Sequence, residues 1–258
     1  RRTRGDGNVT ALLGSILAIT VRAGTSLVYA TVGEIYTERA GILNLGVEGM
    51  MIMGAVCGFA AAFSSGSVWA GVATAIIVGG LLALIHAFPT ITLRADQTVS
   101  GLAITIFGSG LASFLGQRLG PDGHPLVGLI GPKFGKLEIP GLSSIPFLGK
   151  ALFTQDLLVY IMYLLVPIAW FYLYKTRPGL HLRAVGEDPQ AADAMGVSVT
   201  ATRYLYTILG GMLAGLGGAH LSLAYTPGWT EGMTAGRGWI AIALVIFATW
   251  NPLRSVIG

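Results

Sequence analysis

Long apolar runs dominate the chain, and short polar turns such as "SSGS" and "RADQ" separate them. A helix that spans a membrane needs about 20 mostly apolar residues. Six runs are long enough, and a seventh begins near Gly238 and is interrupted by "WNP" at residues 250–252. The predicted spans are residues 9–33, 41–63, 68–93, 98–119, 157–174 and 204–225. The pattern predicts an all-α, polytopic membrane helix bundle with about seven spanning or partly re-entrant helices.

The composition supports a membrane protein and argues against several other classes. Hydrophobic residues make up 53% of the 258 positions and charged residues only 11%, against about 25% charged residues in soluble domains. The 38 glycines suit helices that pack closely in lipid, and "GAVCG" (54–58) and "GMLAG" (211–215) predict such contacts. The net charge of +4 is scattered, so no nucleic-acid partner is expected. We expect one transmembrane domain over residues 1–258, truncated at both ends, since the chain begins with Arg1 and stops within apolar sequence.

Two connections are longer than the others. Residues 120–151 are rich in glycine and proline and predict a structured loop outside the membrane. Residues 175–202 are the most charged part of the chain. In their middle, Asp188 suits the N-cap of a short helix, Pro189 its first position and Gly196 its end.

Several kinds of chemistry have no support in the sequence. No P-loop motif occurs, so the chain itself is not expected to bind ATP in that way. The four histidines are isolated, without the spacing of metal ligands, so no metal site or cofactor is expected. His220, in an apolar helix, is interpreted as a hydrogen-bonded packing residue, with a substrate contact as the alternative.

Polar residues stand inside one apolar run, "NLGVEGMMIMG" at residues 44–54. Asn44 and Glu48 are four positions apart, which predicts that they share one helical face. An ionisable group at membrane depth costs at least about 2.5 kcal/mol, so it generally faces a cavity or a partner. The surrounding glycines permit a break in the helix. Either the broken segment lines a translocation path, or Asn44 and Glu48 satisfy the backbone groups that the break sets free.

The tripeptide "EGM" occurs again at residues 231–233, beside another glycine-interrupted apolar segment. Paired interrupted segments in two halves of a chain are typical of a transporter's binding site. Coincidence between two glycine-rich stretches is the alternative.

Three stretches together resemble one family. They are "GEIYTERAGILNLGVEGMMIMGA" (33–55), "LRAVGEDPQAADAMGVSV" (182–199) and "YTPGWTEGMTAGRGWIAIALVIFATWNPLRSVIG" (225–258). They resemble the integral-membrane permease subunits of bacterial ABC importers in the branched-chain amino acid, ribose and nucleoside class, and most closely the nucleoside (simple sugar) permeases. The chain lacks the family's last spanning segments, in line with a fragment.

The resemblance implies a coupling loop. In the family, a short helix in the cytoplasmic loop docks on the ATPase subunit, and residues 187–196 occupy the matching position. Residues 175–202 are then cytoplasmic, and residues 120–151 are extracytoplasmic. The expected coupling residues are Arg183, Gly186, Glu187, Asp188, Ala192, Asp193 and Gly196.

The resemblance also implies the function and the partners. We expect a non-enzymatic permease of the bacterial plasma membrane that translocates a nucleoside or related sugar. Separate ATPase subunits, a similar but different second permease and an extracytoplasmic binding lipoprotein complete the system. The expected substrate-path residues are Asn44, Glu48, Tyr225, Trp229 and Glu231. Tyr225 and Trp229 could stack on a base or sugar, or could belong to an interfacial aromatic belt.

Two alternatives of other classes remain. In an ion-coupled secondary transporter or channel, Glu48 and Glu231 would carry protons or cations. In an integral-membrane enzyme, the His, Cys, Ser or carboxylate spacing would show a catalytic arrangement, and it shows none.

Overall fold

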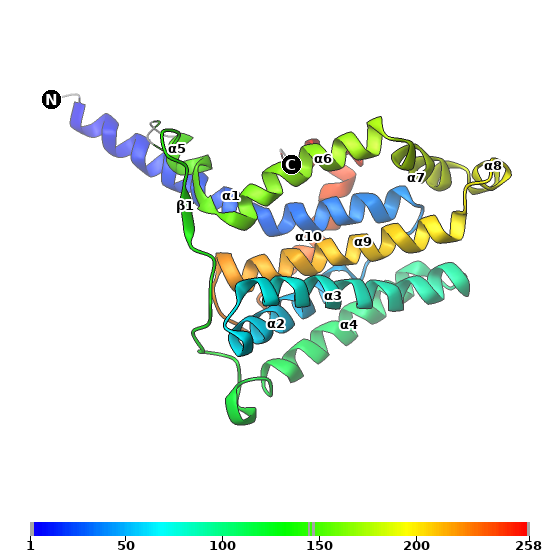
Figure 1. The fold of residues 1–258 in the computed structure, drawn as a ribbon, viewed down its shortest axis with the longest axis horizontal. Coiled ribbons are helices and arrows are strands. Elements are labelled where there is room, and N and C mark those ends of the chain that lie inside the picture. Colours follow the sequence, from blue (N-terminus) through cyan, green and yellow to red (C-terminus); the bar gives the residue numbers. More distant parts are fainter. Residues whose placement is uncertain (1–2, 144, 146–147, 257–258) are drawn as a thin grey trace.

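A computed structural model describes residues 3–143, 145 and 148–256 as a bundle of long helices (Figure 1). Six helices in this part of the chain are long and apolar enough to cross a membrane. They are formed by α1 (Thr3–Arg39), α2 (Val47–Ser65), α3 (Val68–Ala87) with the π-helical turn η1 (Phe88–Thr92), α4 (Gln97–Gly116), α6 (Leu157–Lys175), and α9 (Val199–His220) with the π-helical turn η3 (Leu221–Tyr225). The prediction of an all-α polytopic bundle is confirmed.

The seventh predicted segment is shorter than a span. Helix α10 covers Arg237–Phe247, which is 11 residues, and a 3-10 turn, η4 (Arg254–Val256), follows it. Between them, Thr249 and Trp250 have φ values of 51° and 54°. These left-handed conformations are unfavourable in a helix of L-residues and end α10 before Pro252.

The first two predicted spans have different boundaries in the structure. Helix α1 continues to Arg39, beyond the predicted end at residue 33, and Glu34 within this extension is buried. Helix α2 begins at Val47, although the prediction began at residue 41. Residues 40–46 therefore form a non-helical break between two spanning helices.

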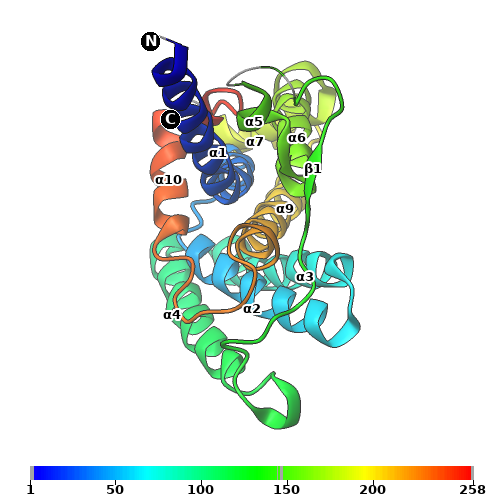
Figure 2. The ribbon, with the colours of Figure 1, turned by 90° about the vertical axis from the view of Figure 1, so that its left-hand side faces the viewer.

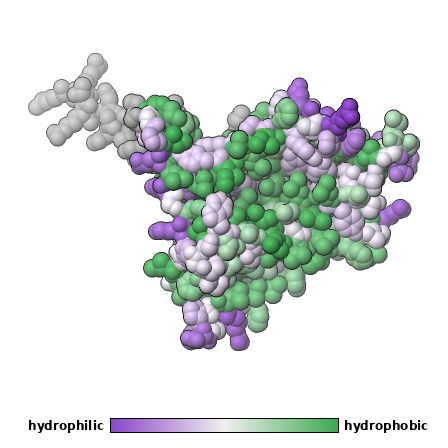
Figure 3. All heavy atoms as spheres, in the orientation of Figure 1, coloured by the Kyte–Doolittle hydropathy of each residue, from purple (hydrophilic) through white to green (hydrophobic). Residues whose placement is uncertain are grey.

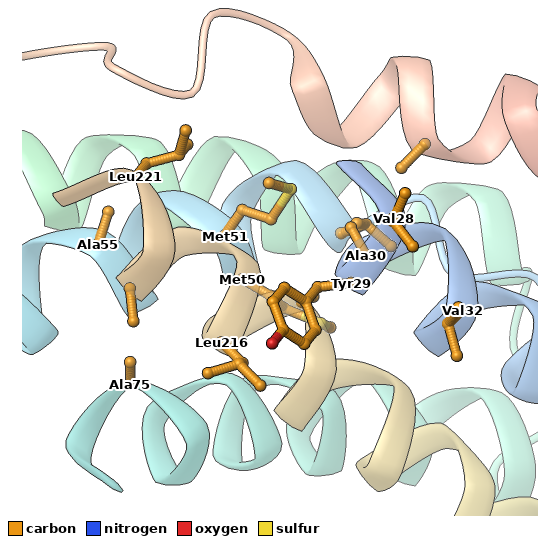
Figure 4. Close-up of a cluster of buried hydrophobic side chains, with 14 of the residues drawn as sticks. Val28, Tyr29, Ala30, Val32, Met50, Met51, Ala55, Ala75, Leu216 and Leu221 are labelled. Atoms are coloured by element: carbon orange, nitrogen blue, oxygen red, sulfur yellow. The ribbon is translucent and has the colours of Figure 1, made fainter. Parts of the chain in front are cut away.

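Helix α9 lies at the centre of the bundle, against α1, α2 and α3 (Figure 2). Glycines allow the close approach, because a Cβ on Gly215 would collide with the backbone of Ala75, and a Cβ on Gly54 would collide with Gly215. The predicted close packing of both glycine motifs is thereby confirmed. Apolar side chains that surround these contacts are drawn in Figure 4 and include Tyr29, Met50, Met51 and Leu216.

The two long connections lie at opposite ends of the bundle (Figure 1). At one end, β1 (Lys136–Glu138) and β2 (Thr154–Asp156) form an antiparallel hairpin with α5 (Leu148–Leu152) between them. A 3-10 turn, η2 (Pro121–Gly123), precedes the hairpin. The sequence did not predict these strands, because three residues are too few for an alternating pattern.

At the other end lie α7 (Arg177–Glu187) and α8 (Pro189–Ala194). The predicted short helix is α8, whereas α7 was not predicted. Thr176 caps α7 by accepting a bond from the backbone N–H of Gly179, and Pro178 stands in its first turn.

The surface agrees with a membrane setting. Figure 3 shows apolar residues over the body of the bundle and hydrophilic residues mainly toward its edges. Large apolar side chains on the spanning helices are exposed, among them Leu81 on α3, Ile106 on α4 and Leu164 on α6. Lipid is the solvent that suits such a surface.

Candidate functional site

The break at residues 40–46 keeps its backbone groups paired through side chains from neighbouring helices. The backbone N–H of Asn44 donates to Glu34 Oε1 at 2.9 Å. The backbone N–H of Leu43 donates to Gln97 Oε1 at 2.7 Å, and its carbonyl lies 3.2 Å from His86 Nε2. Backbone groups that are buried outside a regular helix need such partners.

Two more side chains complete this support. Thr105 of α4 donates to the carbonyl of Leu45 at 2.8 Å. Arg203 of α9 donates through Nε to the carbonyl of Ala40 at 3.2 Å. The break is therefore held by α1, α3, α4 and α9 together, and sequence reasoning missed these partners. The only signal for them was a polar side chain in or beside an apolar run.

Asn44 lies within the break, before the first residue of α2. Its Oδ1 accepts the backbone N–H of Gly46 at 3.0 Å, and its Nδ2 lies 3.5 Å from Met50 Sδ. The prediction that Asn44 and Glu48 share one helical face is wrong, because only Glu48 is in the helix. The glycine-rich sequence around Asn44 favours a turn that its own side chain closes.

Glu48 joins the first turns of two helices. It belongs to the first turn of α2, yet its carboxylate accepts bonds from three groups around the start of α10. Oε1 accepts from Thr234 Oγ1 at 2.6 Å and from the Gly236 N–H at 3.0 Å, and Oε2 accepts from the Gly238 N–H at 2.6 Å. The positive end of each helix dipole favours a carboxylate in this position.

The backbones of α2 and α10 touch at the same point. A Cβ on Gly238 would collide with the backbone N and Cα of Glu48. The two segments that carry "EGM" thus meet in space, through Glu48 and residues 234–238. Glu231 itself is exposed.

The other two predicted substrate-path residues differ in accessibility. Tyr225, at the end of η3, is partly exposed, and the guanidinium of Arg237 lies 5.8 Å from its ring centroid. Trp229 is only 2% exposed and packs against Gly116 at the end of α4. In this conformation Trp229 has no free ring face on which a base could stack.

The predicted coupling residues lie on α7, on α8, at the residue between the two helices and in the turn after α8. Asp188 caps α8 through bonds from the N–H groups of Gln190 and Ala191, each 3.0 Å long. Gly196 ends α8 with a φ of 82°. The predicted cap and end of this helix are confirmed.

These residues differ in exposure. Glu187 and Asp193 are exposed. Ala192 is buried, and Gly186 packs on the carbonyl of Arg39. The guanidinium of Arg183 stacks 5.2 Å from the ring centroid of Tyr174. Sequence reasoning missed Met195, the residue after α8, which is 84% exposed.

A cavity of about 410 Å³ lies between the break and α7. From the break it is lined by Gly41, Ile42 and Leu43, and from α7 by residues that include Arg183 and Glu187. The break therefore lies next to the α7–α8 end of the bundle, with the cavity between them.

The fold and this site define a class of protein. It is a polytopic membrane protein with a non-helical break before α2, and the N-termini of α2 and α10 meet at Glu48. Comparison with known sequences identifies the family: the chain belongs to the branched-chain amino acid transport system / permease component family, whose profile matches residues 15–258. No solved structure matches the chain.

Three similar proteins are permeases by description. A putative glucose ABC transporter permease of Haloferax volcanii is 46% identical over 94% of this chain and 73% of its own length. A nucleoside ABC transporter permease of Lactococcus lactis is 37% identical over 97% and 80%, respectively. A guanosine ABC transporter permease of Bacillus subtilis is 35% identical over 96% and 80%. The chain is thus a multi-pass transport subunit of an ABC importer in the plasma membrane, and its class is not that of an enzyme.

Proposed function

We propose that this permease translocates a nucleoside or a related sugar. The observation that carries the proposal is the meeting of two interrupted segments at Glu48, together with permease relatives whose descriptions name nucleosides, guanosine and glucose. Discontinuous helices whose N-termini point to one place commonly build a transporter's substrate site. Asn44, Glu48, Tyr225 and Glu231 belong to the path or its supports, and Trp229 fixes the loop that carries Tyr225 and Glu231.

The orientation belongs to the same proposal. The α7–α8 end is cytoplasmic, and the hairpin end faces outward. A separate ATPase subunit docks on α8, where Glu187, Asp193 and Met195 are exposed. Because Gly186 touches Arg39 directly before the break, movement of α7 reaches the broken segment without an intermediate side chain.

Two further partners complete the transport cycle. An extracytoplasmic binding protein delivers the substrate at the hairpin end. A second permease, similar to this one, covers part of the exposed apolar surface of α4 and α10 and closes the pathway. Exposed apolar residues suited to this contact are Ile106, Phe107, Ile240 and Phe247.

Uptake by the reconstituted importer tests the proposal. Proteoliposomes would hold this chain with its ATPase, second permease and binding protein, and receive radiolabelled guanosine or glucose. ATP-dependent uptake that disappears with an ATPase-dead subunit is expected. Uptake without ATP that collapses with the proton gradient would contradict the proposal and favour the secondary transporter.

A further inference from the structure

A buried charged cluster connects three elements at the hairpin end of the bundle. Arg22 of α1 is 22% exposed in its side chain, whereas the side chains of Asp156 and His220 are fully buried. Arg22 Nε lies 3.6 Å from Asp156 Oδ2, and His220 Nε2 lies 3.7 Å from the same oxygen. Neither the break nor the α7–α8 end includes these residues.

Asp156 stands at the foot of the hairpin. It is the last residue of β2 and the N-cap of α6, where its Oδ1 accepts the N–H of Val159 at 3.2 Å. The preceding residue, Gln155, donates through Nε2 to the carbonyl of Ala18 in α1 at 3.3 Å. The hairpin is therefore anchored on α1 through consecutive residues.

Arg22 reaches from the hairpin to η3 and to the loop that continues from it, residues 225–238, which carries the proposed path residues Tyr225 and Glu231 and which we call the gate loop. Its Nη2 donates to the carbonyl of Ala224 at 2.9 Å. Ala224 lies in η3, directly before Tyr225 and the loop that continues to Glu231 and Thr234. His220, the residue before η3, also faces Asp156. One arginine thus contacts the bases of both the hairpin and the gate loop.

The side chains of Arg22, Asp156 and His220 face one another without a direct hydrogen bond in this conformation. Both ring nitrogens of His220, Oδ2 of Asp156 and Nε of Arg22 have no hydrogen-bond partner among the described residues. The two ion-pair distances exceed the roughly 2.9 Å of a normal N–H···O bond. Burial raises the pKa of Asp156, but His220, the backbone N–H of Val159 and Arg22 together more than offset it and hold that pKa below the ordinary value.

We infer that Arg22, Asp156 and His220 are positioning residues that link the hairpin to η3 and the gate loop. An extracytoplasmic protein docked on the hairpin then changes the conformation of the gate loop. The inference rests on the proposed function, because it assigns the hairpin end to the binding protein. Buried charges that touch two separate segments are suited to such coupling, since a change in their geometry alters both contacts.

The test measures ATP hydrolysis by the reconstituted importer while the guanosine-loaded binding protein is titrated. Asp156→Asn keeps an N-cap acceptor for α6 but removes the charge that Arg22 and His220 face. We expect basal hydrolysis like that of the wild type, with stimulation by the binding protein lowered about fivefold or more. Asp96→Asn is the matched control, because Asp96 caps α4 in the same way but is exposed and outside the cluster. It should retain full stimulation.

A double variant separates coupling from folding. Arg22→Met with Asp156→Asn removes both members of the Arg22–Asp156 ion pair, so neither charge stays behind without the other, and it should fold even where a single variant does not. If Arg22 and Asp156 act through one link, the double variant should lose as much stimulation as a single variant does, and not the sum of the two single losses. Wild-type stimulation in folded Asp156→Asn or in the folded double variant would overturn the inference. A wild-type importer whose hydrolysis does not respond to the binding protein would overturn the proposed function, and the inference with it.

Discussion

At the scale of single residues, Glu48 is a buried carboxylate that connects α2 to the start of α10. Its two oxygens accept bonds from Thr234, Gly236 and Gly238. Glu48→Gln replaces one carboxylate oxygen by an amide NH2 group. This group is a donor and would face another hydrogen-bond donor at the start of α10. We expect a loss of about 2–3 kcal/mol in unfolding free energy, since bonds to a charged group are lost. The midpoint of unfolding in detergent measures it.

The control for this variant is Glu231→Gln. Glu231 belongs to the second "EGM" but is exposed, so its substitution should leave the unfolding midpoint unchanged. Equal shifts for the two variants would contradict the anchoring role of Glu48. Uptake measured on both variants then shows whether Glu231 acts on transport without acting on stability.

At the scale of helices, the packing of α9 depends on glycine contacts rather than on large side chains. Gly215→Ala would push a methyl group against the backbone of Ala75 on α3. Overpacking of this kind costs about 1–3 kcal/mol. Gly110→Ala on α4 is the matched change, because a Cβ there would contact nothing within 4 Å. We expect only Gly215→Ala to lower the thermal unfolding temperature, and a stable Gly215→Ala protein would contradict the packing argument.

The residue after α8 offers an apolar contact to the proposed ATPase partner. Met195 is 84% exposed beside the proposed ATPase surface, and an apolar side chain there suits the dry centre of an interface. Met195→Asp should abolish copurification of the ATPase and ATP-dependent uptake, whereas Met195→Leu should retain both. Because the side chain is exposed, neither variant should change the unfolding midpoint. If the Met195→Asp protein copurified with the ATPase as well as the wild type does, α8 would not be part of the interface.

At the scale of the whole molecule, the sequence predicts what local patterns encode and misses what the fold brings together. The six spans follow from apolar runs, and α8 follows from Asp188, Pro189 and Gly196. The start of α2 could not be predicted, because the break is stabilised by Gln97, Arg203 and other side chains that are distant in sequence. The contact between Glu48 and α10 could not be predicted from the sequence either, although the repeated "EGM" indicated the two segments.

The orientation of the molecule gives the last prediction. The chain has one cysteine, Cys57, so a Cys57→Ala background carries a single new thiol in each variant. Ile130→Cys lies in the loop before the hairpin, where Ile130 is 90% exposed, and Met195→Cys lies at the opposite end. The proposed orientation places the first thiol outside the cell and the second inside.

A membrane-impermeant maleimide distinguishes the two ends. In right-side-out vesicles it should label Ile130→Cys and leave Met195→Cys unmodified, and in inside-out vesicles the result should reverse. A reversed pattern would place α8 outside the cell, where no ATPase could reach it, and would exclude the coupling role. Because both residues are more than four-fifths exposed, a missing label reports the membrane barrier rather than burial within the protein.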